Sequence, residues 1–272
     1  MAQPSPLAMP FAWNLVAAGY AETSAVLFVP FAERALVLGR VSPGARVVDV
    51  ACGPGTLAAV ASRAGMRVDA LDFSTEMIGQ LRERIAREGL EGIEPVVGDG
   101  MALPYADASF DAAFSLFGLF LFPDRAKGLG ELRRVLRPGG RAIVSSWVPF
   151  ERVPIMAETF AAIRAALPEL PFGEGKAPLA TVEEAKAEVA GAGFTDVEVH
   201  EVSRPFEATS VADFFVQFRR GAPQLALLEQ KLGKEASVVV EEAVLRRLRA
   251  RFGEGAFRAE MIALMTVGTR AA

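Results

Sequence analysis

A glycine-rich turn near residue 50 is the first feature of this chain that could do chemistry. Gly53-Pro-Gly55-Thr-Leu-Ala58 fits the pattern G-x-G-x-x-G/A and joins the β-branched run 46–50 to a helical segment over 56–64. Glycines let the backbone approach a ligand closely, and the following helix offers free N–H groups and the positive end of its dipole. The turn predicts a nucleoside-like ligand, and taken alone it admits NAD(P).

Three aspartates around this turn narrow the choice of ligand. Asp72 ends the second predicted strand, nineteen residues after Gly53, where a carboxylate can accept bonds from both ribose hydroxyls. Asp49 lies inside the first strand, and a buried carboxylate beside a pyrophosphate is costly because like charges repel. Asp99 follows the third strand and could accept a bond from an adenine amino group. The three acids favour a cationic ligand over a dinucleotide.

The elements that must position these residues alternate between short apolar strands and longer helices. This alternation is typical of a parallel, doubly wound sheet. The expected strands are 46–50, 66–71, 93–97, 110–116 and 141–146, and the expected helices are 56–64, 74–88 with Ser74 as N-cap, and 126–136. After Trp147 the pattern changes to a helix over 154–170, a loop over 171–180, a helix capped by Thr181, a strand over 196–203, a helical region over 210–252 and a last strand over 257–269.

Five blocks between residues 41 and 147 resemble the class I S-adenosylmethionine-dependent methyltransferases, and more narrowly the group that includes the ubiquinone and menaquinone C-methyltransferases. The blocks are Val47–Thr56, Ala70–Met77, Gly98–Tyr105, Ser109–Phe114 and Glu131–Gly140. One departure is Gly100, where the family often has Ala. The resemblance implies an α/β fold with a doubly wound, mostly parallel seven-stranded sheet, Rossmann-like, with the last strand antiparallel. It also implies a helical lid over 1–40 and a domain over 41–272 with helical insertions at about 150–180 and 210–252.

The resemblance implies S-adenosylmethionine as cofactor and S-adenosylhomocysteine as product. Gly53 and Gly55 would face its methionine and ribose parts, Asp49 its amino-acid end, and Asp72 its ribose, while Ser115 would face the transferring methyl group. The full set expected to bind the cofactor is Tyr20, Asp49, Ala51, Gly53, Gly55, Asp72, Phe73, Met77, Gly98, Asp99, Gly100, Met101 and Ser115.

We expect an apolar acceptor chamber beside the cofactor, because a dry site that aligns the acceptor supplies much of the catalysis of methyl transfer. Its expected walls are Trp13, Phe117, Phe120, Trp147 and Phe150. The aromatic cluster after the fourth strand could equally be core. No catalytic residue is assigned. Tyr20 is a candidate polar group near the sulfonium or the acceptor, and Glu151 is a candidate base.

Composition bounds the remaining possibilities. The net charge of −4 argues against a nucleic-acid partner, as does Phe114-Ser-Leu-Phe117 in place of the Asn/Asp-Pro-Pro-Tyr block of nucleic-acid amino-methyltransferases. Cys52 is the only cysteine, so it is expected to be a packed hydrophobe, and His200 is expected at the surface. No metal-ligand pattern occurs, and the apolar run 114–122 is too short to cross a bilayer.

The expected protein is a cytoplasmic monomer or homodimer that methylates a small molecule, with a mobile segment over its first ten residues. Two alternatives stay open. One is a non-catalytic S-adenosylmethionine-binding module, and the other is an NAD(P)-dependent oxidoreductase.

Overall fold

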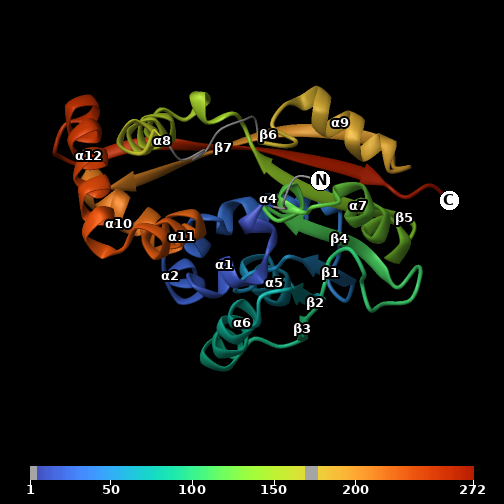
Figure 1. Ribbon diagram of the computed structural model, residues 1–272. Helices are drawn as coiled ribbons and strands as arrows, with labels where there is room; N and C mark the ends of the chain where they lie inside the picture. The colour runs from blue at the N-terminus through green and yellow to red at the C-terminus, as the bar shows by residue number, and fades with distance from the viewer. Residues whose placement is uncertain (1–4, 169–176) are drawn as a thin grey trace.

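The computed structural model describes residues 5–168 and 177–272. Through these residues runs one seven-stranded sheet in the order β3-β2-β1-β4-β5-β7-β6 (Figure 1). Strands β1 to β5 pair in parallel, and β7 runs antiparallel to both β5 and β6. The strands are β1 Arg46–Val50, β2 Arg67–Asp72, β3 Ile93–Val97, β4 Phe110–Leu116, β5 Leu136–Trp147, β6 Thr195–Ala208 and β7 Phe257–Thr269. The predicted fold class is confirmed.

Helices cover both faces of the sheet because successive side chains of a strand point to opposite faces. Val47 packs with α4 Val29–Gly39, α5 Thr56–Arg63 and α6 Thr75–Glu88 on one face. Val48 packs on the other face with α7 Arg125–Val135 and α9 Val182–Gly191. Strand β1 is therefore buried on both sides, which explains why valines on both of its faces accompany the single acid Asp49.

Local signals in the sequence placed several helix ends correctly. The Ser74 hydroxyl accepts a bond from the Met77 N–H, and the Thr181 hydroxyl accepts one from the Glu184 N–H, so both residues are N-caps as predicted.

Other predicted boundaries are wrong by several residues. Strand β5 begins at Leu136 rather than 141, because buried Leu136 pairs with Phe110 across a bulge before the regular register resumes. Strand β6 continues to Ala208 rather than 203, because it pairs with β7 along its whole length. The predicted helix over 154–170 ends at Ala166, and the loop residues 171–176 lie outside the described residues.

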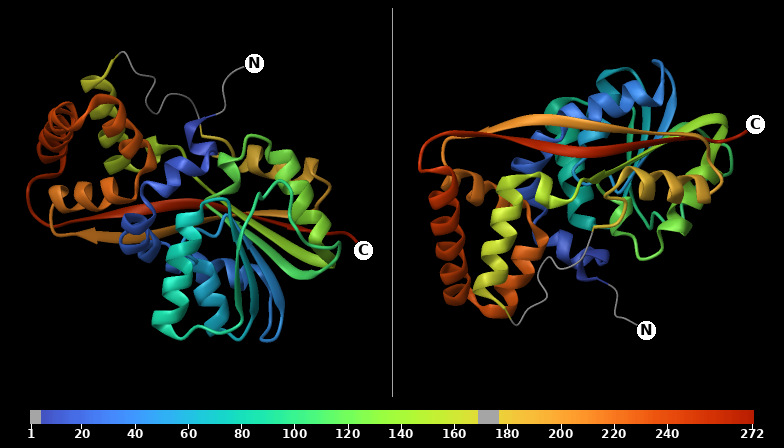
Figure 2. Two further views of the ribbon diagram at one scale, coloured as in Figure 1. Left: turned by 60° about the horizontal axis from the view of Figure 1, so that its bottom comes forward. Right: turned by 90° about the horizontal axis from the view of Figure 1, so that it is seen from above.

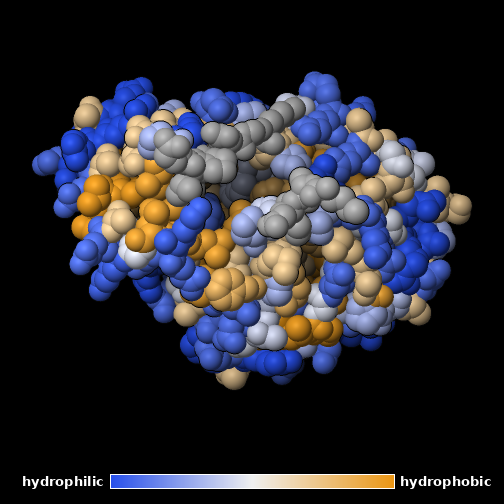
Figure 3. Space-filling view, viewed as in Figure 1, coloured by the Kyte–Doolittle hydropathy of each residue, from blue (hydrophilic) through white to orange (hydrophobic). Residues whose placement is uncertain are grey.

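The antiparallel pair β6–β7 extends well past the parallel strands and carries a group of helices at its far end (Figure 2). These are α8 Pro154–Ala166, α10 Val211–Gly221, α11 Pro223–Leu232 and α12 Lys234–Phe252. They have a hydrophobic core of their own, which includes Phe160, Ile163, Phe215, Val244 and Leu248. We call this group the helical unit. In the space-filling view, hydrophobic surface gathers over the helical unit and around the hollow beside it (Figure 3).

The N-terminal helices lie between the sheet and the helical unit (Figure 2). They are α1 Pro10–Asn14, α2 Ala17–Glu22, α3 Ser24–Leu27 and α4. Contact with α10 is close enough that a Cβ at Gly19 would lie 2.3 Å from the Arg220 carbonyl oxygen. Pro6–Ala8 form the short helix η1, within the segment that is expected to be mobile from the sequence. The Trp13 indole N–H donates to the Leu7 carbonyl and so joins η1 to α1. Residues 1–4 lie outside the described residues.

Candidate cofactor and acceptor site

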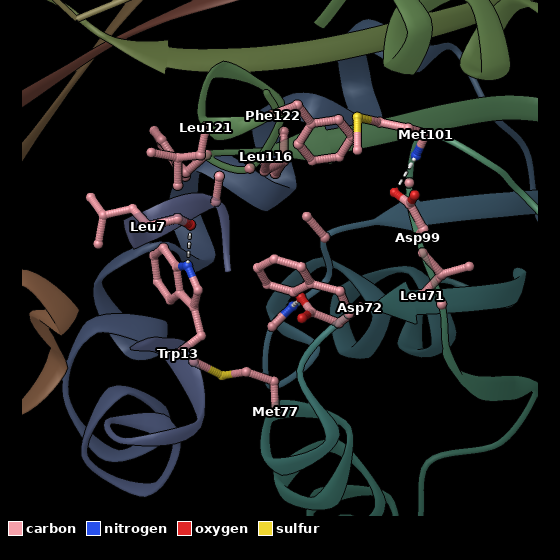
Figure 4. Close-up of a pocket in the computed structure, with 18 of the residues that line it drawn as sticks. Leu7, Trp13, Leu71, Asp72, Met77, Asp99, Met101, Leu116, Leu121 and Phe122 are labelled. Atoms are coloured by element: carbon pink, nitrogen blue, oxygen red, sulfur yellow. Dashed lines mark hydrogen bonds between the residues drawn. The ribbon is translucent and has the colours of Figure 1, made fainter. Parts of the chain in front are cut away.

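A cavity opens at the carboxyl ends of β1, β2 and β4 and beside the end of β3. It encloses about 730 Å³ of space between its lining residues, a figure that includes its open mouth. The order of the sheet reverses between β1 and β4, and ligands of open α/β sheets bind at such a switch point. In Figure 4, Leu7 and Trp13 lie on one side of the cavity and Asp99 and Met101 on the other, with Asp72 between them.

The glycine turn follows β1 and has left-handed backbone at both glycines, with φ of 55° at Gly53 and 76° at Gly55. Glycine takes up this conformation without steric cost. Gly53 lines the cavity, whereas a Cβ at Gly55 would lie 2.3 Å from the Leu81 side chain in α6. The two glycines thus differ in role: Gly53 leaves room for a ligand, and Gly55 allows α6 to pack against the turn.

Asp72 is held rigidly at the edge of the cavity. Its carboxylate accepts a bond of 2.8 Å from the Gly53 N–H and one of 2.9 Å from the Ser74 N–H. Burial raises the pKa of Asp72 to about 6, although these backbone donors lower it. The side chain is only 5% exposed and that exposed edge faces the cavity. A carboxylate fixed in this way can accept bonds from a ligand without first being ordered.

Asp49 is a second buried carboxylate, behind the turn rather than in the cavity wall. It is 2% exposed, and its Oδ2 has no hydrogen-bond partner. Burial raises its pKa to about 7; the Ala58 N–H opposes this shift, and the negative charge of Asp72 adds to it. Two buried carboxylates next to one cavity favour a ligand that carries positive charge.

Asp99 and its neighbours form the end of the cavity beyond β3. The Asp99 Oδ1 accepts a bond of 2.8 Å from the Met101 N–H. A Cβ at Gly100 would lie 2.5 Å from the Phe122 ring and 2.8 Å from the Val50 side chain. An alanine, which the family resemblance would suggest at this position, would therefore require Phe122 to move. Phe73, Met77 and Leu71 complete the lining around Asp72 and Asp99.

The opposite part of the cavity is apolar. Its lining residues are Leu7, Ala8, Trp13, Leu116, Phe117, Gly118, Leu121 and Pro123, and Phe122 lies between this part and Gly100. Among the described residues that line the cavity, Lys, Arg, His and Glu are absent. Tyr20 lines it as well, and burial together with the charge of Asp72 raises its pKa well above the usual value. Its hydroxyl therefore stays protonated and can donate a hydrogen bond.

The cavity brings most of the residues expected in the site together, but not all of them. Those that line it are Trp13, Tyr20, Ala51, Gly53, Asp72, Phe73, Met77, Gly98, Asp99, Gly100, Met101 and Phe117. Asp49, Gly55 and Ser115 do not reach the lining.

The expected acceptor residues lie partly elsewhere. Trp147 packs behind the wall, stacked on Phe117 at 4.0 Å between ring centroids, and Phe120 packs between the two sides of the core. Phe150 belongs to the helical unit, where it stacks on Phe160 at 4.7 Å. Glu151 is exposed in η3 Phe150–Arg152, and His200 pairs with Glu198 at the side of β6.

Several lining residues were not expected, namely Leu7, Ala8, Leu71, Leu116, Gly118, Leu121 and Pro123. Phe122 belongs to the aromatic cluster after the fourth strand, for which a role in the site and a role in the core were equally expected. The same apolar run could have indicated Leu121, since loops at the carboxyl edge of a sheet face its ligand. Leu7 carries no such signal. It reaches the cavity only because η1 folds back onto Trp13.

The described residues fit S-adenosylmethionine. Gly53 leaves space for close approach, Asp72 is fixed as an acceptor, and the unpartnered Asp49 Oδ2 lies near a site that would hold positive charge. Among the described residues there is no group of acids, cysteines and histidines that could hold a metal ion. No helix of that same part of the chain is long and apolar enough to cross a membrane.

Comparison with known proteins agrees with this geometry. Residues 48–144 match the family model described as a methyltransferase domain. A demethylmenaquinone methyltransferase of Corynebacterium kroppenstedtii is 45% identical over 102 residues, which cover 38% of this chain and 42% of that protein. This chain thus spans less than half the length of that relative.

Solved structures share the fold at low identity. The [4+2]-cyclase SpnF is 19% identical with a TM-score of 0.57, covering 90% of this chain and 82% of its own. A Haemonchus contortus phosphoethanolamine N-methyltransferase, solved with phosphomonomethylethanolamine and S-adenosylhomocysteine, is 18% identical with a TM-score of 0.54, covering 87% of this chain and 51% of its own. Residues 48–144 of this chain therefore match a methyltransferase domain, and the chain is similar to S-adenosylmethionine-dependent methyltransferases, the demethylmenaquinone methyltransferases among them.

Proposed function

We propose that this protein transfers a methyl group from S-adenosylmethionine to a small, apolar acceptor inside the cavity. The observation that carries the proposal is the division of one cavity into an acidic part around Asp72 and Asp99 and an apolar part around Phe117 and Leu121. The acidic part suits a cationic nucleoside, and the apolar part suits an acceptor that must approach it without water.

The cofactor, when bound, supplies a methyl group on a sulfonium, and the chain supplies position and dryness. Asp72 and Asp99 would hold the ribose and the adenine, and the charge of Asp49 would favour the cationic end. Leu7 and Trp13 would exclude water from the cavity. This is the role that we propose for residues 1–40 as a lid. The segments at about 150–180 and 210–252 would complete that cover.

The acceptor is expected to bring its own nucleophilic lone pair. The described lining residues contain no histidine, lysine or glutamate, and Tyr20 stays protonated. Asp72 and Asp99 are assigned to the cofactor, so no group in the described lining is left to remove a proton from the acceptor. Suitable acceptors are therefore flat, apolar molecules with a neutral amine or with a hydroxyl, thiol or carbon acid that ionises in water. Acceptors with a carboxylate or phosphate would meet no positive charge in the wall and would approach two acids.

The proposal is tested first by binding. Isothermal titration calorimetry should show binding of S-adenosylmethionine and S-adenosylhomocysteine and none of NAD(P). Asp72→Ala should weaken binding by about 1–3 kcal/mol, the cost of losing charge-assisted hydrogen bonds. Asp107→Ala, at an exposed ion pair with Arg134, is the control and should leave affinity unchanged. Equal affinities of the two variants would refute the ribose assignment.

Catalysis is tested by mass spectrometry of a panel of aromatic amines, phenols and thiols, each paired with a carboxylated analogue. We expect methylated products from the uncharged members and little from the carboxylated ones. The fold alone also accommodates a cyclase, as SpnF shows, so methyl transfer has to be demonstrated directly. Cofactor binding without any methylated product would favour a non-catalytic binding module, and NAD(P) binding alone would favour an oxidoreductase. A cytoplasmic location and a monomeric or homodimeric state stay predictions.

A further inference from the structure

Two chain reversals with unusual backbone meet at the centre of the cavity wall. Ala51, just after β1, has φ of 58°, and Phe117, just after β4, has φ of 59°. For residues other than glycine the left-handed conformation is unfavourable, and most of all for a bulky one. Such conformations persist only where the surrounding structure enforces them, and they cluster at functional sites.

At Phe117 the enforcing group is the hydroxyl of Ser145. The Phe117 N–H donates to the Ser145 Oγ at 2.9 Å, and Ser145 is only 1% exposed. Ser145 lies on β5 directly opposite Leu116, the last residue of β4. Because this N–H is buried, leaving it without an acceptor would be costly, so the hydrogen bond holds the direction in which the chain leaves β4.

The conformation of Phe117 in turn places its ring in the cavity wall. The ring stacks on Trp147 with centroids 4.0 Å apart and planes 14° apart, and it meets Phe31 edge-on at 5.5 Å. Phe28 contacts the same ring from α4's side at 4.9 Å. Phe117 is thus the member of this aromatic cluster that lines the cavity, whereas Phe28, Phe31 and Trp147 do not reach the lining.

The next residue joins this wall to the cofactor turn. A Cβ at Gly118 would lie 2.4 Å from the Ala51 Cβ, and Ala51 itself lines the cavity just before Gly53. Neither atom could move aside, because Ala51 has no flexible side chain. The spacing between the cofactor turn and the acceptor wall is therefore set by backbone contact at this point.

We propose that Ser145 is a positioning residue: through the Phe117 N–H it holds the Phe117 ring at the place where the acceptor meets the methyl group. The role in transfer rests on the proposed function, whereas the effect on the ring does not. Ser145 would not touch the acceptor. Its contribution is expected in the turnover number rather than in cofactor affinity, because Phe117 lies beyond the acids that hold the cofactor.

The chain offers a matched control in the next residue. Ser146 is 2% exposed and its hydroxyl donates to the Leu179 carbonyl, away from the cavity. Ser145→Ala and Ser146→Ala each remove one buried hydrogen bond from the same strand, so they should lower stability comparably. Only Ser145→Ala should change the cavity wall.

The first experiment requires no acceptor. The chain has two tryptophans, so Trp13→Phe leaves Trp147 as the only one, and its fluorescence reports directly on the Phe117 stack. In that background Ser145→Ala should raise the acrylamide quenching constant of Trp147 at least two-fold, and Ser146→Ala should leave it unchanged. Equal quenching in the two variants would overturn the proposal even if the protein proves to be a methyltransferase.

The second experiment uses an acceptor from the panel above. Ser145→Ala should lower kcat at least ten-fold while the Kd for S-adenosylhomocysteine stays within three-fold, and Ser146→Ala should change neither. In a Phe117→Ala background, Ser145→Ala should have no further effect on kcat, because the ring it positions is gone. An undiminished effect there would show that Ser145 acts by another route.

A third variant covers the case in which Ser145→Ala does not fold. Gly118→Ala should move the wall away from the turn and lower kcat at least ten-fold, since the backbone at Gly118, with φ of −110°, accepts alanine and only the contact with Ala51 is disturbed. Gly130→Ala, where a Cβ would meet nothing within 4 Å, is its control. If Gly118→Ala keeps wild-type kcat, the wall does not set the transfer geometry and the proposal fails.

Discussion

Asp49→Asn tests the electrostatics of the site without requiring an acceptor. The substitution keeps the shape of the side chain and removes a buried charge whose pKa is raised from 3.8 to about 7, mainly by burial. Because the pKa is higher in the folded than in the unfolded protein, the folded state binds more protons between about pH 4 and pH 7. The wild-type protein therefore loses stability as the pH rises through this window.

The magnitude follows from the slope of that loss. The loss is about 1.4 kcal/mol per pH unit in the middle of this window and falls to half of that at pH 7, where Asp49 is half ionised. The wild type should therefore lose about 2–3 kcal/mol of unfolding free energy from this residue between about pH 5 and pH 7.5. The Asp49→Asn variant lacks this component. It would leave an amide unpaired at the position of the partnerless Oδ2, which costs about 1–3 kcal/mol at either pH. The change with pH is therefore the diagnostic quantity.

Urea unfolding of both proteins without cofactor, followed by circular dichroism at about pH 5 and pH 7.5, measures this change. We expect the unfolding free energy of the Asp49→Asn variant relative to wild type to improve by about 2–3 kcal/mol on going to the higher pH. The same variant should bind S-adenosylhomocysteine more weakly at the higher pH, because it has lost the charge that favours an ammonium group. A stability difference that is the same at both pH values would refute the assignment of a raised pKa to Asp49.

Two further predictions concern the N-terminal helices. Asn14→Ala removes the acceptor of a 2.6 Å bond from the Ser74 hydroxyl, which joins α1 to the loop that follows Asp72. The variant should weaken S-adenosylhomocysteine binding by about 1 kcal/mol in calorimetry. An unchanged Kd would show that this bond does not hold the lid. Gly19→Ala, whose Cβ would lie 2.3 Å from a carbonyl of α10, should lower stability by about 1–3 kcal/mol in thermal unfolding. Gly79→Ala, with open space around the Cβ, should instead raise it by about 1 kcal/mol, and equal effects would contradict the tight contact.

Much of the parallel half of the fold was predictable because its signals are local. Each strand from β1 to β4 is a short apolar run, and the caps Ser74 and Thr181 are marked by their own side chains. The length of β6 was underestimated because Arg204 to Ala208 have no apolar alternation. Those residues are extended only because β7 pairs with them.

The acceptor side was less predictable than the cofactor side for a comparable reason. Phe117, Trp147 and Phe150 are all aromatic and lie at or just after the ends of strands, yet only Phe117 reaches the cavity. Trp147 lies behind it in the same stack, and Phe150 is drawn into the helical unit by Phe160. Composition cannot distinguish such residues, since aromatic side chains stabilise any apolar environment equally well.

The amino-acid sequence alone determined the succession of strands and helices, and with it the position of Asp72 and Asp99 at one edge of the sheet, because parallel strands end on the same side. The tertiary structure decided what those acids face. The left-handed backbone at Phe117 and the unpartnered burial of Asp49 arise from contacts between segments distant in the sequence, and Leu7 lies over the cavity because η1 folds back onto Trp13. Desolvation and side-chain direction depend on such contacts, which is why they could be established only from the folded protein.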